Sequence, residues 1–224
     1  MLIQLDFSAV LASWPLLVRG VAWTIGLTIV GTVLGLLLGT ACAWARARNL
    51  GHRPAPLRWA VASYVELVRN TPFIVQLFFL FFGLPALGLK LSPEFASVLA
   101  MVINLGAYSA EIIRAGIEAT PRGQIEAAHS LALTPGQTFR HVVLPPALQK
   151  VWPAMVSQII IVMLGSAVCG QISTPELSYA ANLISSNTFR AFEAFILATL
   201  VYLALSMLTR RLLMWVGARF LVGR

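Results

Sequence analysis

Apolar residues gather into five long runs along the chain, and the segments between them hold most of the polar residues. The runs cover residues 21–45, 59–84, 95–117, 152–172 and 192–213. Each is close to the roughly 20 residues that a helix needs to cross a bilayer. Because lipid offers backbone groups no hydrogen-bond partners, such runs predict helices. The pattern therefore predicts an all-α, polytopic membrane protein with five transmembrane helices.

The segment before the first run, residues 7–19, has Pro15 inside it and is predicted to form an interfacial helix. We therefore divide the chain into an N-terminal interfacial segment, residues 1–19, and a single transmembrane domain, residues 20–224. The first residues show no basic flank and no cleavage site, so we expect no signal peptide. Gly31, Gly35 and Gly39 share one helical face, which favours close helix packing within the subunit.

Composition supports the membrane assignment. The chain is 58% hydrophobic and 11% charged, whereas a soluble domain carries about 25% charged residues. The net charge of +8 does not indicate nucleic-acid binding, because the basic residues lie at the ends of the apolar runs. Cys42 and Cys169 lie inside runs and are typical of apolar filling rather than of a disulfide or metal pair.

The basic residues also predict an orientation. With the N-terminus outside, eleven basic residues fall in inside segments and three in outside segments. The inside residues are Arg46, Arg48, Arg53, Arg58, Arg122, Arg140, Lys150, Arg210, Arg211, Arg219 and Arg224. The outside residues are Arg19, Lys90 and Arg190. This bias predicts that residues 118–151 and the C-terminus are cytoplasmic.

Several chemistries have no support in the sequence. A G-x-x-x-x-G-K-[ST] phosphate loop is absent, so the chain is not expected to hydrolyse ATP by that route. His52, His129 and His141 lack metal-ligand spacing, and neither an H-E-x-x-H nor a G-x-S-x-G motif occurs. We expect no enzyme, no metal and no cofactor on this chain.

The cytoplasmic loop, residues 118–151, is too polar to span but rich in helix formers. Ile125, Ala128, Leu131 and Ala132 share a face, which predicts a short amphipathic helix. Thr134, Pro135 and Gln137 form a capping-box pattern for a second short helix, which Pro145 and Pro146 are expected to stop before the fourth span. This loop is either a stiff projection that enters a groove on another protein or an ordinary connection between spans.

This stretch resembles the EAA loop of binding-protein-dependent ABC importer permeases. Glu126-Ala127-Ala128 and Leu144-Pro145 match the pattern of that family, but Ala132 stands where the family usually has glycine. Alanine favours helix at that position, so the bend is expected to be shifted or less sharp. The resemblance implies that this loop is a coupling helix that docks onto an ATPase subunit. The implied contact residues are Gln124, Glu126, Ala127, Ala128, Leu131, Ala132 and Phe139.

The resemblance extends over nearly the whole chain from Gly20. Residues 66–77 with 82–85, and residues 104–116, look like the second and third spans of polar amino-acid permeases of the histidine, glutamine and arginine type. It implies a type I importer permease in a bacterial inner membrane. It also implies a separate ATP-binding subunit that carries ATP and Mg²⁺, a second permease copy or homologue, an external solute-binding protein and a small polar substrate.

A charge at bilayer depth costs about 2.5–3.5 kcal/mol on insertion scales, so each polar residue in a span needs a reason. Glu66, Arg69, Glu111 and Arg114 lie toward the cytoplasmic ends, where we expect ion pairs that fix helices to each other, including Glu111 with Arg114. Deeper polar residues are candidates for a substrate pathway, helped by the helix bond that Pro72 removes. These candidates are Asn70, Thr71, Gln76, Asn104, Tyr108, Gln158 and Ser166.

The fourth span departs from the family. Amino-acid permeases often carry Lys-Asp-Thr-Ser-Leu before Pro-Glu-Leu, and this chain has Leu164 and Gly165 at the two charged positions before Pro175-Glu176-Leu177. Either a partner supplies the substrate contacts, or the substrate is not an ordinary charged amino acid.

Two other functions explain parts of the pattern. An ATP-independent secondary transporter or channel would use Glu66 or Glu111 as a proton relay, but no inverted repeat with paired broken helices is evident. A structural membrane anchor would leave the deep polar residues unexplained.

Overall fold

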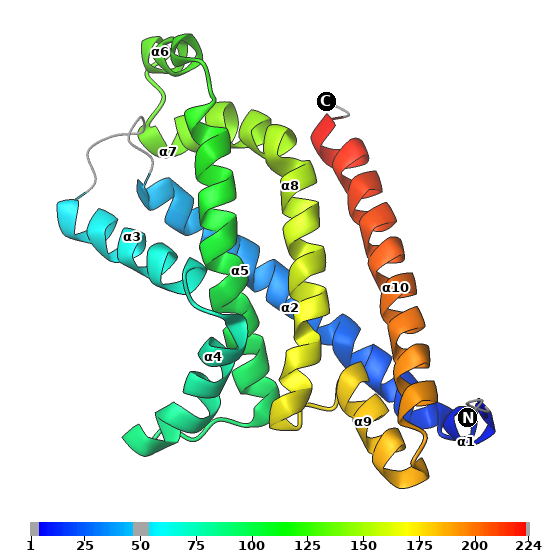
Figure 1. Ribbon diagram of the computed structural model, residues 1–224. Coiled ribbons are helices and arrows are strands. Elements are labelled where there is room, and N and C mark those ends of the chain that lie inside the picture. Colours follow the sequence, from blue (N-terminus) through cyan, green and yellow to red (C-terminus); the bar gives the residue numbers. More distant parts are fainter. Residues whose placement is uncertain (1–4, 47–53, 223–224) are drawn as a thin grey trace. The chain divides into compact units, whose positions relative to one another are not determined.

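The computed structural model describes residues 5–46 and 54–222, and these residues form helices joined by short turns, with no strand among them (Figure 1). The all-α prediction is confirmed. The helices are α1 Ser8–Ala12, α2 Trp14–Arg46, α3 Ala55–Arg69, α4 Phe73–Phe78, α5 Pro93–Glu118, α6 Arg122–Ser130, α7 Pro135–Gln137, α8 Leu144–Gly165, α9 Leu177–Thr188 and α10 Ala191–Val216.

Four stretches of the described chain are long and apolar enough to cross a membrane by themselves: Trp14–Arg46, Pro93–Glu118, Pro135–Ile172 and Ala191–Leu221. A fifth span arises if α3 and the helical stretch after it, Phe73–Leu87, are taken together. Each of the five apolar runs therefore falls in one of these stretches. Of the basic residues used to predict orientation, Arg48, Arg53 and Arg224 lie outside the described residues.

Two predicted boundaries are wrong. The segment at residues 7–19 is not one interfacial helix, because α1 ends at Ala12 and residues 14–19 are the first turns of α2. The second span is not continuous, because the chain leaves the helix between Arg69 and Phe73. Pro72 explains this break: proline disfavours helical conformation in the residue before it and lacks a backbone N–H.

The helices fall into two compact units. The first contains the described residues of Met1–Gly31, Phe73–Met101 and Ile160–Thr209, and the second contains those of Thr32–Pro72, Val102–Ile159 and Arg210–Arg224. Helices α2, α5, α8 and α10 contribute to both units.

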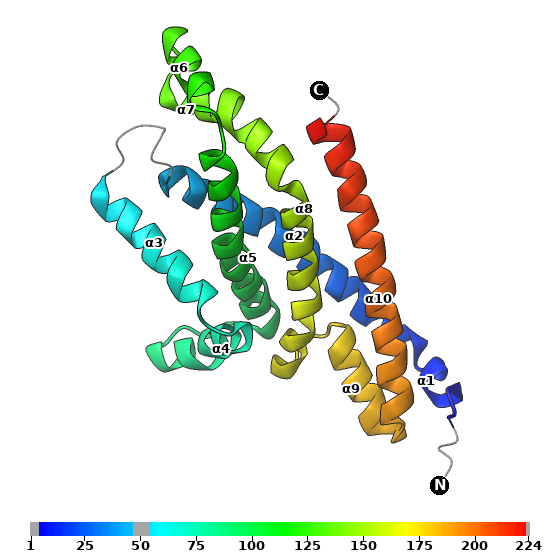
Figure 2. The ribbon, with the colours of Figure 1, turned by 45° about the horizontal axis from the view of Figure 1, so that its top comes forward.

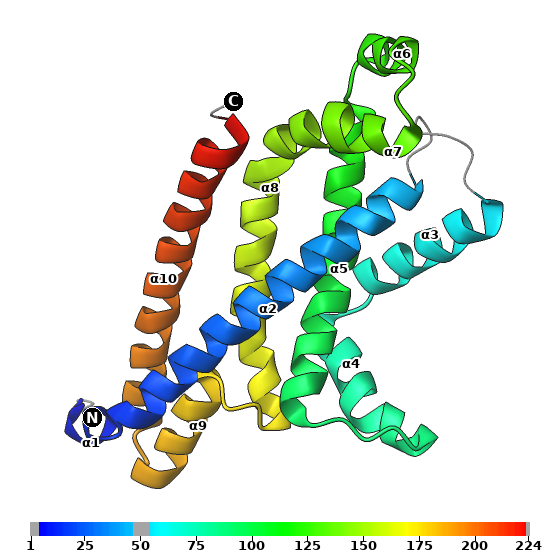
Figure 3. The same ribbon diagram turned by 180° about the vertical axis from the view of Figure 1, so that it is seen from behind.

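In the first unit, α1 and α9 pack with the beginnings of α2 and α10 (Figure 3). The buried residues of this cluster are Val10, Leu17, Leu177, Ala181, Ile184, Ala194 and Ala198. Helix α9 was not predicted, and it begins at a buried carboxylate. Glu176 is fully buried and accepts hydrogen bonds from the backbone N–H groups of Ser178 and Tyr179 at 2.8 and 2.7 Å.

The hydroxyl of Tyr202, on α10, also donates to Glu176, at 2.5 Å. Gly170 leaves the space for this carboxylate, since a Cβ there would lie 2.5 Å from its Oε1 atom. Burial raises the pKa of the Glu176 carboxyl, and the three hydrogen bonds oppose that rise. Glu176 is thus a buried helix cap, and both of its carboxylate oxygens accept hydrogen bonds within the chain.

In the second unit, the C-terminal half of α2 packs on α5 through glycine. A Cβ on Gly35 would meet Leu105 at 2.9 Å, and one on Gly39 would meet Ser109 at 2.4 Å. Within the first unit, Gly31 faces Met101 in the same way at 3.2 Å. The small-residue stripe therefore serves packing inside the chain, as its spacing predicts.

Candidate functional site

The predicted cytoplasmic loop lies in the second unit and extends beyond the end of α5 (Figures 1 and 2). Helix α6 rests on this unit by one face. Ile125 and Ala128 are 7% and 2% exposed. Ile125 belongs to a core cluster with Phe139, Val143 and Ala147. The same cluster contains Ala43 of α2 and Ile113 and Ile117 of α5, so the loop is anchored in the core of the second unit.

The opposite face of α6 is open. Gln124, Glu126 and Ala127 are exposed, and the side chain of Leu131 is 76% exposed. The prediction that Leu131 lies on the buried face is wrong, because α6 ends at Ser130 and Leu131 is its C-cap. An apolar side chain is thereby left in the open at the tip of the helix.

Two of the implied contact residues are not on the surface. Ala128 is buried, and Phe139 is 8% exposed with its ring 5.9 Å from that of Trp44 on α2. These two residues are therefore packing residues of the loop rather than part of its exposed surface. Gln124, Glu126, Ala127, Leu131 and Ala132 remain as its exposed surface.

The bend after α6 is present at its usual position. Ala132 adopts a left-handed conformation with φ of 55°. Its N–H bonds the carbonyl of His129 at 2.9 Å, and the N–H of Leu133 bonds that of Ala128 at 3.1 Å. This is a Schellman motif, which glycine usually closes. The expectation of a shifted bend is wrong, because these bonds hold Ala132 in a conformation that alanine disfavours. That the bend is less sharp than in the family stays a prediction.

The capping box after the bend is present. Thr134 Oγ1 accepts from the N–H of Gln137 at 3.3 Å, and Gln137 Oε1 accepts from the N–H of Thr134 at 2.9 Å. The second short helix does not stop at Pro145 and Pro146, however. A π-helical turn, Thr138–Val143, leads directly into α8, so the two prolines lie inside one continuous helical stretch, Pro135–Ile172.

Beneath the loop, charged residues link α2 and α5. Arg46 Nη1 lies 3.2 Å from Glu111 Oε2, Arg114 binds the same carboxylate, and Arg114 Nη1 lies 2.5 Å from Glu118 Oε1. The structure thus contains the Glu111–Arg114 pair within a chain of four charges. All four side chains are partly exposed, so each contact contributes little by itself, and their value lies in fixing the end of α5.

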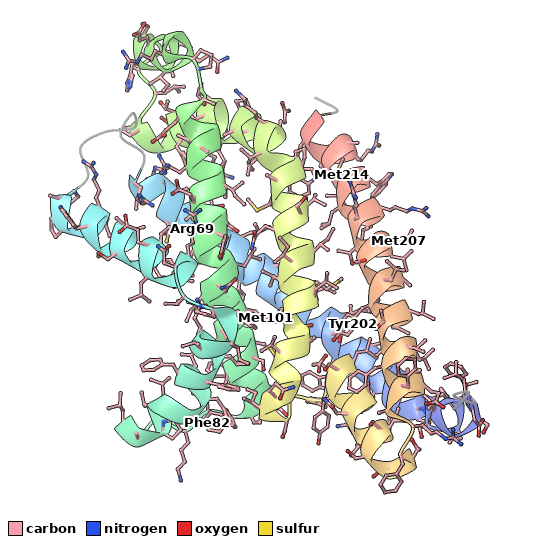
Figure 4. The ribbon with its side chains drawn as sticks, viewed as in Figure 1. Arg69, Phe82, Met101, Tyr202, Met207 and Met214 are labelled. Atoms are coloured by element: carbon pink, nitrogen blue, oxygen red, sulfur yellow. The ribbon has the colours of Figure 1, made fainter. Side chains whose placement is uncertain are left out.

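Glu66 and Arg69 do not form a pair. Within residues 5–46 and 54–222, Glu66 has no ion pair. Arg69 lies at the end of α3 (Figure 4). Its guanidinium is 5.6 Å from the ring centroid of Tyr108 on α5. That contact is a cation–π interaction, worth about 0.5–1 kcal/mol at an exposed site.

The polar candidates around the α3 break bond to the end of that helix. Asn70 Nδ2 donates to the Glu66 carbonyl at 2.7 Å, and Thr71 Oγ1 donates to that of Leu67 at 2.9 Å. Tyr108 donates to the carbonyl of Arg69 at 3.4 Å. The Glu66 carbonyl also accepts from the Asn70 N–H at 3.1 Å, so these side chains add donors to the last carbonyls of α3, where intrahelical partners run out.

The other pathway candidates are divided between the units. Asn104 is 8% exposed and lies one turn before Tyr108 on α5, and Gln158 is half-buried on α8. Gln76 and Ser166 belong to the first unit. Ser166 is fully buried and donates to the carbonyl of Met163 at 2.6 Å, so its hydroxyl does not face a path in this conformation.

Two residues of evident importance were missed as site residues. Arg46 was used only as a topology charge, because nothing in the sequence pairs it with Glu111, which is 65 positions away. Glu176 was noted only within Pro-Glu-Leu. Nothing local marked it as a cap, because glutamate is not among the residues that usually begin a helix in this way.

Comparison with known proteins decides the family. Residues 31–222 match the family described as "Binding-protein-dependent transport system inner membrane component". The chain belongs to this family. The permease is similar to the arginine transport system permease protein ArtQ of Bacillus subtilis, with 33% identity over 203 residues that cover 90% of this chain and 91% of ArtQ.

It is also 33% identical to the glutamine transport system permease protein GlnP of Escherichia coli over 215 residues, covering 93% and 96% of the two chains. Among solved structures, an amino acid ABC transporter with histidines aligns with a TM-score of 0.84 at 33% identity, covering 97% of this chain and 100% of that one. A methionine transporter, MetNI, aligns with a TM-score of 0.70 at 24% identity, which shows the fold alone. The chain is a multi-pass permease subunit of an ABC importer of the polar amino-acid type.

Proposed function

We propose that this permease forms the path by which an amino acid or a related small polar solute crosses the bacterial inner membrane. We further propose that α6 couples the path to an ATPase on a separate subunit. The names of the relatives support the substrate class, since they include arginine, glutamine and cystine permeases.

One observation supports the coupling role: one face of α6 packs against the second unit, and the opposite face is exposed. The core beneath Ile125 holds the helix as a rigid body. Glu126 offers a carboxylate and Leu131 an apolar side chain to a partner. A partner that covered this face would remove the apolar side chain of Leu131 from water, which is favourable.

The expected mechanism is alternating access driven by this contact. ATPase subunits that hold ATP and Mg²⁺ close, draw two α6 helices together and turn the path outward. A solute-binding protein then delivers its solute, and hydrolysis restores the inward-facing state. Because five spans are few for enclosing a path, we expect a second permease, either a copy or a homologue. The N-terminus outside and the C-terminus in the cytoplasm would place α6 on the side of the ATPase.

The test is uptake of labelled amino acids into proteoliposomes that contain the permease, its ATPase subunit and its solute-binding protein. Glu126→Lys should reduce ATP-dependent uptake by at least about tenfold, because it reverses a charge at the contact. It should also weaken co-purification of the ATPase. Lys90→Glu is the matched control, an exposed charge reversal in a predicted outside segment, and should leave co-purification unchanged.

Normal uptake by an assembled Glu126→Lys permease would contradict the coupling proposal. Uptake that needs no ATP and collapses when uncouplers are added would instead support a secondary transporter. Uptake of none of the amino acids tested, with ATP hydrolysis intact, would overturn the substrate class.

A further inference from the structure

The second unit contains a cavity of about 610 Å³ that has no part in the coupling contact. It lies among the end of α2, the first turns of α3 and the end of α5. Its lining residues are Arg46, Ala55, Arg58, Trp59, Ala62, Glu66, Arg114 and Glu118. The volume is in the range of about 300–1,000 Å³ that is usual for small-molecule sites.

One wall of this cavity is already neutralised. Arg46 and Arg114 both bind Glu111, and Arg114 also binds Glu118. These charges are held in place by one another, so they form a polar but balanced surface. A ligand would gain little from them alone.

The α3 wall differs. Arg58 and Glu66 have no ion pair with any described residue. Both line the cavity from one helix, about two turns or 12 Å apart along its axis. Ala62 lies between them and leaves space, and Trp59 adds an aromatic side chain that is 75% exposed. The wall therefore presents a cation at one end, an anion at the other and a hollow between.

We propose that this cavity binds a zwitterion, a small molecule with an anionic oxygen group at one end and an ammonium group at the other. Arg58 receives the anionic group and Glu66 the ammonium group, while Trp59 covers the carbon atoms between them. A simple anion fits less well, because Glu66 would oppose it. Arg58 belongs to the inside-facing residues, so the predicted ligand is cytoplasmic.

Two sources offer this chemistry: a free amino acid in the cytoplasm and the headgroup of phosphatidylethanolamine. Binding by this cavity does not require the proposed coupling, because it uses no residue of α6.

The test uses the full-length permease in nanodiscs of phosphatidylglycerol, which lacks an ammonium group, with labelled L-glutamine as the probe. Its uncharged side chain leaves only the zwitterionic part to be recognised. Arg58→Gln and Glu66→Gln should each weaken binding by about tenfold or more, the usual loss of a hydrogen bond to a charged group. Both residues are exposed, so neither change should unfold the chain.

A steric pair sharpens the test. Ala62→Leu should narrow the space between Arg58 and Glu66 and weaken binding without changing any charge. Ser63→Leu adds the same kind of bulk at the next residue, which is exposed and outside the lining, and should bind as the wild type does. Tyr108→Phe, in the candidate pathway, should leave binding at this cavity intact and excludes that other site as its origin.

A separate measurement tests the phosphatidylethanolamine headgroup as the ligand. If glutamine does not bind, native mass spectrometry from mixed nanodiscs should show phosphatidylethanolamine retained over phosphatidylglycerol, with the preference lost in Arg58→Gln. Binding of either ligand that depends on Arg58, Glu66 and Ala62 supports the proposal and identifies the source. Absence of both, or binding that survives these three changes, overturns it.

Discussion

Two short helices connect long ones in this chain, and they use their glutamates in opposite ways. Helix α9 begins at Glu176, which is fully buried and bonded to two backbone N–H groups and a tyrosine hydroxyl. Helix α6 carries Glu126 on its open face. The buried carboxylate has its acceptors in use within the chain, so it serves the fold. The exposed one remains available to a partner.

The comparison shows what distinguishes a carboxylate that stabilises the fold from one that can bind a partner. The first is buried and its oxygens accept hydrogen bonds within the chain, whereas the second is exposed. Sequence position does not separate them, since each glutamate belongs to a short helical segment between two long helices. It also predicts that changes at α9 act on stability, whereas changes at α6 act on transport.

The largest expected effect is at Glu176. Glu176→Ala should destabilise the permease by about 3 kcal/mol, because two N–H groups and a hydroxyl lose their buried acceptor. Thermal unfolding of the detergent-solubilised chain measures the loss. Glu176→Gln keeps one acceptor oxygen, so its stability should lie between that of the wild type and that of Glu176→Ala. A Glu176→Ala protein as stable as the wild type would show that the cap is not a structural charge.

Leu131 offers the reverse case. Leu131→Asp should lower ATP-dependent uptake by about tenfold, as loss of an apolar anchor does at an interface, while the unfolding temperature stays unchanged. Leu89→Asp is a suitable control, because Leu89 is 59% exposed and lies outside both the loop and the candidate spans. A fall in stability that accounts for the lost uptake would make Leu131 a fold residue and break the comparison.

Thr134 tests whether the loop must be stiff. Thr134→Ala removes half of the capping box and should cost about 1 kcal/mol. We expect faster amide exchange in residues 134–143 and a modest loss of uptake, with ATPase binding retained. If uptake falls while amide exchange is unchanged, Thr134 acts by contact rather than by capping.

Ala132 gives the smallest effect and the opposite sign. Ala132→Gly should stabilise the loop by about 0.5 kcal/mol, because relief of the left-handed strain exceeds the added entropy of the unfolded chain. Ala132→Val should destabilise it, since a β-branched residue tolerates positive φ still less. Equal stability of the wild type and these two variants would argue against a left-handed Ala132.

Much of this fold could be predicted from the sequence, because in lipid the length of an apolar run decides the element. The break at Pro72 could not be placed from hydropathy, since apolar residues continue on both sides of it. Helix α9 was missed because its 12 residues lie between spans and are too few to cross a membrane. Its start depends on Glu176 meeting Tyr202, a contact between distant residues.

The candidate site was predictable in its local parts. The Thr134–Gln137 box depends on residues three apart, so the sequence contains it. The exposure of Leu131 depends on where α6 ends, which the bonds around Ala132 decide. The pathway residues near Pro72 were recognised as polar groups at depth, but their use as partners for the carbonyls of α3 needs the coordinates.

The link between Arg46 and Glu111 has a consequence for biosynthesis. Arg46 leaves the ribosome 65 residues ahead of its partner, so during synthesis it is one of four arginines, with Arg48, Arg53 and Arg58, that follow the first apolar run. On the predicted orientation, these cations keep the end of that run at the cytoplasmic surface until α5 is made. The guanidinium of Arg46 thus first contributes to the orientation of the chain in the membrane and later forms the ion pair that links α2 to α5.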